Sequence, residues 1–230
     1  MPIVEIDSVV KHYASPDGEV VRALDGLTLS VEAGEVVAVY GPSGSGKTTL
    51  LKVVAALLKP DQGSVRVRGR EVTALRERDA DSYRLTEVGF IPQTPEFVAG
   101  GTAVDNAAFK LLGRYRIAEA RKRVRDLMEQ LGLGERLRHR EDQLSGGERQ
   151  RVMIARALAI DPAVILADEP TGNLDRRRSE DVLQLLKELS HTRSTATILV
   201  THDELAARYA DRILRLGDGR VEPAATAAPA

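Results

Sequence analysis

The sequence predicts an α/β fold, in which a mostly parallel sheet is covered by helices, with an antiparallel β subdomain before it and a helical insert subdomain. Three observations support this prediction. Within residues 3–31, Ile3 to Val10 alternates between apolar and polar residues as a half-exposed strand does, and two more short strand patterns follow. From Thr102 to Leu137 the apolar residues recur with a helical period. From Gly146 onward, helical and strand patterns take turns, which is typical of a parallel sheet with helices on both faces.

The N-terminal region is expected to hold short strands joined by turns. Ile3 to Val10 alternates as one strand would. Two more strands are expected at Val20–Leu24 and Leu27–Val31, because Asp25-Gly26 between them has the composition of a turn. Ala33-Gly34 ends this β-rich region just before the central strand.

That strand opens the stretch on which the functional prediction depends. Val36 to Tyr40 is followed by a glycine-rich turn, and a helix is expected from Lys47 to Leu58. A glycine, four residues and then Gly-Lys-Thr fit the phosphate-binding loop pattern in its strand–turn–helix context. Glycines allow successive backbone N–H groups to point at one anion, and the N-terminus of the helix adds its positive dipole. The residues expected to bind a nucleoside triphosphate in this P-loop NTPase core are Gly41, Pro42, Ser43, Gly44, Ser45, Gly46, Lys47, Thr48 and Thr49. Lys47 should reach the β- and γ-phosphates, and the Thr48 hydroxyl should ligate Mg²⁺.

A helical subdomain is expected at about residues 88–143. It starts with a buried strand, Val88–Ile91, which ends at Pro92-Gln93. The helical stretch that follows has one apolar stripe, made of Ile117, Val124, Leu127, Met128 and Leu131. Acidic residues interrupt its basic face, so the prediction is a solvated helix. A formal net charge of −1 also argues against a nucleic-acid-binding protein.

Two acids end the apolar strand Val164–Ala167. Because ligands bind beyond the carboxyl ends of strands in open α/β sheets, Asp168 and Glu169 should face the phosphate loop. Asp168 is suited to hold Mg²⁺, and Glu169 to polarise the attacking water as a general base.

A second glycine-rich group of N–H donors, Ser145-Gly146-Gly147, begins the next helix. The chain thus has two anion cradles but one Lys47. The simplest explanation is that Ser145, Gly146 and Gly147 complete the nucleotide site of another copy of the chain.

Together these motifs resemble the ATP-binding cassette (ABC) ATPases, over nearly the whole chain. The matches are Tyr13 to the aromatic residue that stacks on adenine, Gly41–Thr48 to the Walker A loop, Gln93 to the Q-loop glutamine, Leu144–Gln150 to the signature, Asp168 and Glu169 to Walker B, Leu174-Asp175 to the D-loop, and His202 to the switch histidine. The resemblance implies catalytic roles for Glu169, His202 and Gln93. It also implies ATP contacts for Tyr13 and Asp175, and Mg²⁺ ligation by Thr48, Gln93 and Asp168.

Residues Leu166–Asp175 resemble the branch of the family that serves macrolide exporters, lipoprotein-release systems and a cell-division complex. The resemblance implies an ATPase that forms a head-to-tail dimer around two ATP molecules and drives a transmembrane permease, by a mechanical movement called mechanotransmission. Two features depart from that branch: Pro92 before the Q-loop glutamine, and the stretch Glu96–Gly101, which should touch the membrane partner. A cell-division regulator that switches a membrane partner without transport would use the same residues. A chromosome-maintenance ATPase would need a long coiled coil before Ser145, and no sustained heptads are present.

Residues 1–222 are expected to form one domain, and 223–230 a disordered tail, because the tail lacks apolar periodicity. No apolar run approaches the length of a bilayer crossing, and the N-terminus lacks the pattern of a signal peptide. The expected location is therefore the cytoplasm, on the inner face of the membrane through the permease and without direct insertion.

Overall fold

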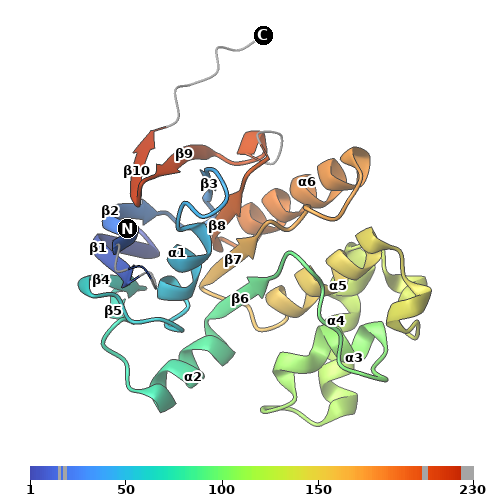
Figure 1. The fold of residues 1–230 in the computed structure, drawn as a ribbon. Coiled ribbons are helices and arrows are strands. Elements are labelled where there is room, and N and C mark those ends of the chain that lie inside the picture. The colour runs from blue at the N-terminus through green and yellow to red at the C-terminus, as the bar shows by residue number, and fades with distance from the viewer. Residues whose placement is uncertain (15–16, 18–19, 204–206, 224–230) are drawn as a thin grey trace.

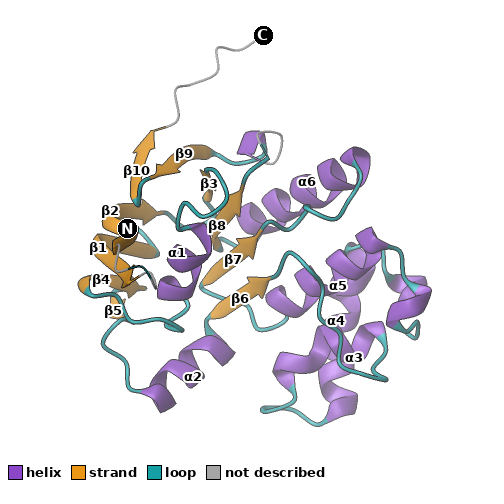
Figure 2. Ribbon diagram, in the orientation of Figure 1, coloured by secondary structure: helices purple, strands orange, loops and turns teal. Residues whose placement is uncertain are grey.

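The structure, a computed structural model, describes residues 1–14, 17, 20–203 and 207–223. Two sheets lie side by side at one end of the molecule, and most of the helices lie at the other (Figures 1 and 2). In these described ranges, no helix combines the length and the apolar composition that a membrane crossing would require.

The N-terminal sheet is antiparallel where its strands pair, as predicted. Its spatial order is β2 (Val20–Val31), β1 (Val4–Ala14), β4 (Gln62–Val67) and β5 (Arg70–Glu71). The two strands expected at 20–31 are a single strand, because Gly26 takes a φ of 78° inside β2 and lets it bend without ending. The sheet is tied to the rest of the fold by the Asp25 amide, which donates to the Gly219 carbonyl at 2.8 Å.

The central sheet carries the site. Its order is β10 (Arg220–Pro223), β9 (Arg212–Gly217), β3 (Val36–Tyr40), β8 (Ala196–Thr201), β7 (Val164–Asp168) and β6 (Val88–Ile91). All neighbours from β9 to β6 pair in parallel, and β10 joins β9 as an antiparallel hairpin at the edge. The parallel strands therefore end at one edge of the sheet, whatever their distance in the sequence.

Side chains of the central strands alternate between two hydrophobic cores. Val37 and Val39 pack with helix α1 (Lys47–Val54) and the antiparallel sheet. Ala38, between them, belongs to the core that holds the insert helices and α6 (Arg176–Thr192). The parallel sheet thus has apolar side chains on both faces, as the uninterrupted apolar strands of the sequence indicate.

The helical part comprises α3 (Ala103–Ala108), the 3₁₀ turn η1 (Phe109–Leu111), α4 (Ile117–Gln130), the 3₁₀ turns η2 (Gly134–Arg136) and η3 (Glu141–Gln143), and α5 (Gly146–Leu158). α3 packs against both α4 and α5. β6, which the expected insert range of 88–143 includes, is a strand of the central sheet.

Several predicted details differ from the structure. α1 ends at Val54 rather than Leu58, because Ala56 takes a φ of 51°, which breaks the helix. Helix α2 (Glu77–Thr86) was not predicted. Ile117, expected on the apolar stripe of α4, is 44% exposed at the start of that helix. Pro223, expected in the tail, ends β10. Residues 224–230 of the expected tail, and part of the helix expected after His202, lie outside the described residues.

Candidate functional site

Four loops meet at the edge where the parallel strands end. The loop 41–46 follows β3, and Gln93 lies two residues beyond β6. Asp168 is the last residue of β7, and His202 follows β8 directly. Residues that are far apart in the sequence are thereby brought together, as open α/β sheets do at the carboxyl ends of their strands.

The glycines of loop 41–46 are required by close backbone approaches. Gly46 has a φ of 101°, and a Cβ there would lie 2.0 Å from the Ala23 carbonyl oxygen. A Cβ on Gly41 would lie 2.3 Å from the Leu216 carbonyl oxygen. The loop is therefore held against β2 on one side and β9 on the other, and only glycine fits at these two positions.

Lys47 begins helix α1 and is almost fully buried, with 6% of its surface exposed. Its ammonium donates to the carbonyl oxygens of Gly41 and Pro42, both at 2.8 Å. Burial lowers the pKa of Lys47, while the charges of Glu169 and Asp168 oppose that shift. No side chain caps α1, since the residue before it is Gly46. The first N–H groups of the helix and the ammonium thus converge on the loop, which is the arrangement that binds phosphate.

Ser45 also fits an anion. Its hydroxyl is buried and has no hydrogen-bond partner within the described residues. Because buried polar atoms are normally paired, an orphaned hydroxyl inside a loop of N–H donors indicates a missing acceptor. Phosphate oxygens are acceptors of this kind.

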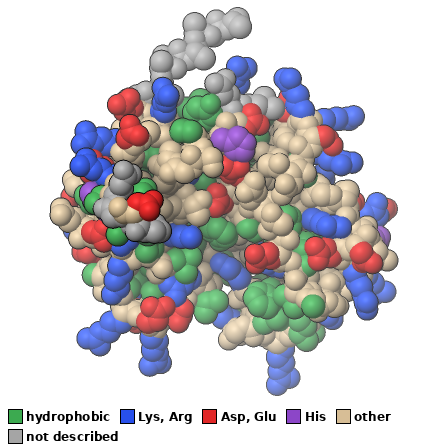
Figure 3. Space-filling model, viewed as in Figure 1, with side chains coloured by type: hydrophobic (Ala, Val, Ile, Leu, Met, Phe, Trp, Pro, Cys, Tyr) green, Lys and Arg blue, Asp and Glu red, His purple; other side chains and the backbone are tan. Residues whose placement is uncertain are grey.

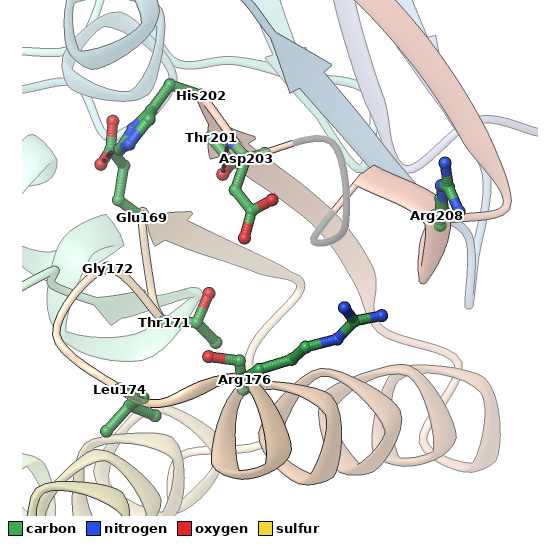
Figure 4. Close-up of a pocket in the computed structure, with 10 residues that line it drawn as sticks. Glu169, Thr171, Gly172, Leu174, Arg176, Thr201, His202, Asp203 and Arg208 are labelled. Carbon is green, nitrogen blue, oxygen red and sulfur yellow. Dashed lines mark hydrogen bonds and ion pairs between the residues drawn. The ribbon is translucent and has the colours of Figure 1, made fainter.

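The two acids differ in their surroundings. The Thr48 hydroxyl donates to Asp168 Oδ2 at 3.3 Å. Burial raises the pKa of Asp168, and the neighbouring Glu169 charge raises it further, against the Thr48 hydrogen bond and the Lys47 charge. Glu169 Oε2 lies 2.7 Å from His202 Nδ1 and accepts a longer contact, 3.4 Å, from Gln93 Nε2. Figure 4 shows the Glu169 and His202 side chains pointing toward one another.

Glu169 also has an unusual backbone. Its φ is 44°, in the left-handed region that non-glycine residues seldom adopt. The Glu169 amide donates to the Val200 carbonyl at 2.9 Å, and its carbonyl accepts from Gly172. These bonds hold the turn after β7, so that the carboxylate is aimed at the edge of the sheet.

A cavity of about 380 Å³ joins most of the predicted residues. It is lined by Tyr13, Val21, Ala23, Ser43, Gly44, Gly46, Lys47, Thr48, Thr49, Gln93, Asp168 and Glu169. Sequence reasoning missed Val21 and Ala23, although the glycine pattern at 41–46 signals that some other backbone must approach the loop closely. A larger cavity, of about 830 Å³, lies beyond Glu169 and includes His202 and Arg176 (Figure 4).

Ser145, Gly146, Gly147 and Asp175 do not line the 380 Å³ cavity. Ser145 caps α5, where its hydroxyl accepts from the Glu148 amide at 3.3 Å. Asp175 caps α6 in the same way, and a Cβ on Gly146 would lie 3.3 Å from a Leu174 methyl group. The predicted residues thus form two groups in one chain, one at the cavity and one at the starts of α5 and α6, on the other side of the view in Figure 1.

The sequence model of the ABC transporter family matches residues 24–172. The chain belongs to the ABC transporter family. It is 47% identical to a lipoprotein-releasing system ATP-binding protein, LolD, of Pseudomonas syringae pv. tomato, over 88% of this chain and 90% of that protein. It is 42% identical to a macrolide export ATP-binding/permease protein, MacB, of Hyphomonas neptunium. That match covers 96% of this chain but 34% of the relative, so the chain spans about a third of its length.

Solved structures agree with the sequence comparison. A dimeric ATP-binding cassette, MJ0796, in a post-hydrolysis state bound to ADP and Pi superposes with a TM-score of 0.85 and 38% identity, over 95% of this chain and 96% of that one. The expected fold and the assignment to the ABC ATPases are therefore confirmed. The chain is the ATP-binding, ATP-hydrolysing component of an ABC transporter.

Proposed function

We propose that this chain works as a head-to-tail dimer that encloses two Mg²⁺-ATP molecules and drives a separate transmembrane permease. One observation carries the proposal: Ser145–Gly147, the predicted second anion cradle, and Asp175 lie at the starts of α5 and α6 and do not line the cavity at Lys47 of the same chain. A second copy, turned end to end, can supply this cradle to the cavity. The superposing cassette is described as dimeric, which supports a dimer of this chain.

In this proposal the loop 41–49 holds the phosphates of ATP. Lys47 exchanges its carbonyl partners for the β- and γ-phosphates, and Ser45 gains the acceptor that it lacks. Tyr13, which is 41% exposed at the rim of the cavity, stacks on the adenine. Thr48 and Asp168, already in contact at 3.3 Å, hold Mg²⁺ together with Gln93.

Within the described residues, no three histidine, aspartate or glutamate side chains group closely enough to hold a metal by themselves. A magnesium ion that is bound mainly through phosphate oxygens and water needs few protein ligands, which fits the hydroxyl of Thr48, the carboxylate of Asp168 and the amide of Gln93 here. When bound, the ion would neutralise the charge that builds up on the phosphates. Ligation would also stabilise the half-buried Asp168 carboxylate beside the Glu169 charge.

For the chemical step, we propose Glu169 as the general base that accepts a proton from the attacking water. His202 orients the Glu169 carboxylate through its 2.7 Å contact and faces the γ-phosphate. Gln93 lies on the other side, 3.4 Å from the same carboxylate oxygen, and links the water to the loop that follows β6. Active sites often carry backbone strain such as the left-handed Glu169 and perturbed acids such as Asp168, whose pKa is raised by burial and by the Glu169 charge.

The partner follows from the relatives. One named relative is a macrolide export protein whose name combines ATP-binding and permease, and the other is the ATP-binding protein of a lipoprotein-releasing system. We therefore propose a permease partner that places this chain on the inner face of the membrane and that is moved by mechanotransmission. Hydrophobic side chains gather on the surface over the insert in Figure 3. Val98, Phe109 and Leu112 of the insert are exposed, and they would give such a partner a surface to contact.

A crosslinking experiment tests the dimer. The chain has no cysteine, so Ser43→Cys and Gly147→Cys introduce a single pair. A Cβ at position 147 meets Arg178 side-chain atoms at 3.5 Å or more, which leaves room for the substitution. The expected result is an intermolecular crosslink that requires ATP and disappears when Lys47→Ala is added. An intramolecular crosslink, or one that is independent of ATP, would contradict the composite site.

A further inference from the structure

The loop 96–101 lies between Gln93 and α3, and its shape depends on one buried side chain. Asn106 on α3 is fully buried. Its Oδ1 accepts from the Val98 amide at 2.8 Å, and its Nδ2 donates to the Thr102 carbonyl at 2.9 Å. The Gly101 amide closes the turn on the Val98 carbonyl at 2.9 Å. The loop backbone is thus folded back onto the helix that follows it.

Arg156, in the last turn of α5, holds this arrangement from the other side. Its Nε donates to the Asn106 carbonyl at 2.9 Å, one Nη to the Glu96 carbonyl at 2.9 Å, and the other Nη to Asn106 Oδ1 at 2.6 Å. All three hydrogen bonds come from the planar, charged guanidinium of one half-buried arginine. Such charge-assisted bonds fix the orientation of the groups that they hold as well as their distance. Burial lowers the pKa of the Arg156 guanidinium, while the nearby Glu96 charge opposes that shift.

α5 carries a second tie to the same segment. Gln150, 2% exposed, donates from Nε2 to the Pro92 carbonyl at 3.1 Å. The segment from Pro92 to Asn106 is therefore fastened to α5 at two points, six residues apart along the helix. In Figure 1, α3 and α5 lie together at the same side of the molecule, in agreement with their packing contact.

α5 begins directly after Ser145, and Arg156 lies in its last turn. At 1.5 Å per residue, Ser145 and Arg156 are about 16 Å apart along the helix. Most of the helix is buried: Val152 through Ala155 have no exposed surface. A buried, hydrogen-bonded helix of this length is stiff, so that a displacement of one end is passed to the other.

We infer that Arg156 is a positioning residue that fastens loop 96–101 to α5, so that the loop follows the Ser145 end of the helix. The inference rests on the proposed function in one respect, which is that Ser145 meets the nucleotide of a second copy and the loop meets the permease. Under that assignment, closure of the dimer on ATP reaches the permease-facing surface through α5 and Arg156. The Gln93 loop, which follows β6, provides a separate connection from the nucleotide itself.

The test is hydrogen exchange on the isolated full chain, with peptides that cover residues 94–102. Arg156→Gln removes the fork, and the Val98 amide should then exchange about tenfold faster or more, because Asn106 loses two of its holding bonds. The matched control is Arg151→Gln. It removes an arginine from the same helix whose side chain donates to the Leu131 carbonyl at 3.4 Å, away from the loop. The control should leave exchange at 94–102 unchanged.

Two further variants separate positioning from general support of the fold. Arg156→Lys keeps the charge but has no fork, and it should show most of the increase in exchange. In an Asn106→Ala background, Arg156→Gln should add little, because both substitutions release the same loop. Unchanged exchange at 94–102 in Arg156→Gln, or an equal increase throughout the central sheet, would overturn the inference.

The consequences for the dimer are measured separately. In the Ser43/Gly147 cysteine background, Arg156→Gln should preserve the ATP-dependent crosslink, because Arg156 contacts neither cradle. Loss of that crosslink in Arg156→Gln alone would also contradict a purely positioning role. If the crosslink is absent from the parent chain as well, the composite site fails, whereas the exchange result still decides whether Arg156 fastens the loop.

Discussion

Replacing Glu169 with glutamine should separate ATP binding from ATP hydrolysis. The substitution keeps the shape of the side chain and one oxygen that can accept from His202 or Gln93, which now share Glu169 Oε2 at 2.7 and 3.4 Å. Glutamine cannot take a proton from water. Loss of a general base typically slows a reaction by about 10²–10⁴-fold, which corresponds to a barrier higher by about 2.7–5.5 kcal/mol.

Binding should persist in this variant, because the groups that hold the nucleotide are untouched. Lys47, Thr48 and Asp168 remain, and the pKa of Asp168 should fall toward its ordinary range since Glu169 is one of the charges that raise it. The negative charge lost near the phosphates also weakens repulsion across a partly desolvated interface. Glu169→Gln should therefore accumulate as an ATP-bound dimer.

Two assays decide the matter. Size-exclusion chromatography in Mg²⁺-ATP should show a stable dimer for Glu169→Gln, a monomer or weak dimer for the parent, and no ATP-dependent dimer for Lys47→Ala. Phosphate release should fall by about 10²-fold or more. If Glu169→Gln hydrolyses ATP at the parental rate, the assignment of the base is wrong, and His202 or Gln93 must position the water instead.

Three further predictions concern the glycines of the loop 41–46, the stacking of Tyr13 on adenine and the pH dependence of stability. Gly46→Ala should abolish ATP binding, and it should lower the free energy of unfolding in urea by more than about 2 kcal/mol, because its Cβ would lie 2.0 Å from the Ala23 carbonyl oxygen. Gly44→Ala has open space around its Cβ and should lower the free energy of unfolding by only about 1 kcal/mol. Tyr13→Ala should raise the dissociation constant of ATP by about 5- to 150-fold in a fluorescence titration, with little loss of maximal rate, whereas Tyr13→Phe should bind like the parent. Asp211 has a pKa lowered to about 2, against the effect of burial, by hydrogen bonds and an ion pair. Its ionised form therefore stabilises the fold at neutral pH, so Asp211→Asn should lower the free energy of unfolding by about 1–2 kcal/mol at pH 7. This difference between the variant and the parent should shrink as the pH falls from about 4 toward about 2. An equal cost at pH 7 and pH 3 would contradict that account.

Strong periodic patterns predicted the fold, and weak ones were missed. The central strands are continuous apolar runs, so Val36–Tyr40 and Val164–Ala167 could be recognised directly. Helix α2 buries only Ala80 and Tyr83, which leaves no apolar stripe for a pattern to detect. Tyr83 is held instead by a hydrogen bond from its hydroxyl to the Val54 carbonyl at 2.9 Å, a tertiary contact that no local sequence rule contains.

In the site, too, some features could be predicted from the sequence and others depend on tertiary contacts. Spacing and residue type located Lys47 and the two acids, because phosphate binding requires those groups in that order. Spacing does not give distances, however, and the contact between Gly46 and Ala23 depends on how β2 passes the loop. Arg156 was not singled out, since an arginine on a helix has no distinguishing pattern until Asn106 is placed beside it. Polar networks between distant segments are the part of a site that sequence reasoning reaches last.

The alternation of Val37, Ala38 and Val39 between two cores has a consequence for partial unfolding. Each face of the central sheet packs with its own set of elements, so α3 and α4 can open without exposing the side chains beneath α1. Nucleotide held by the loop 41–49 opposes only the openings that disrupt that loop, by about 2.7 kcal/mol at a hundredfold excess over the dissociation constant. In a single chain, ATP should therefore shield the α1 face from proteases while the insert remains open to cleavage, and protection of the start of α5 should appear only when a second copy closes on it.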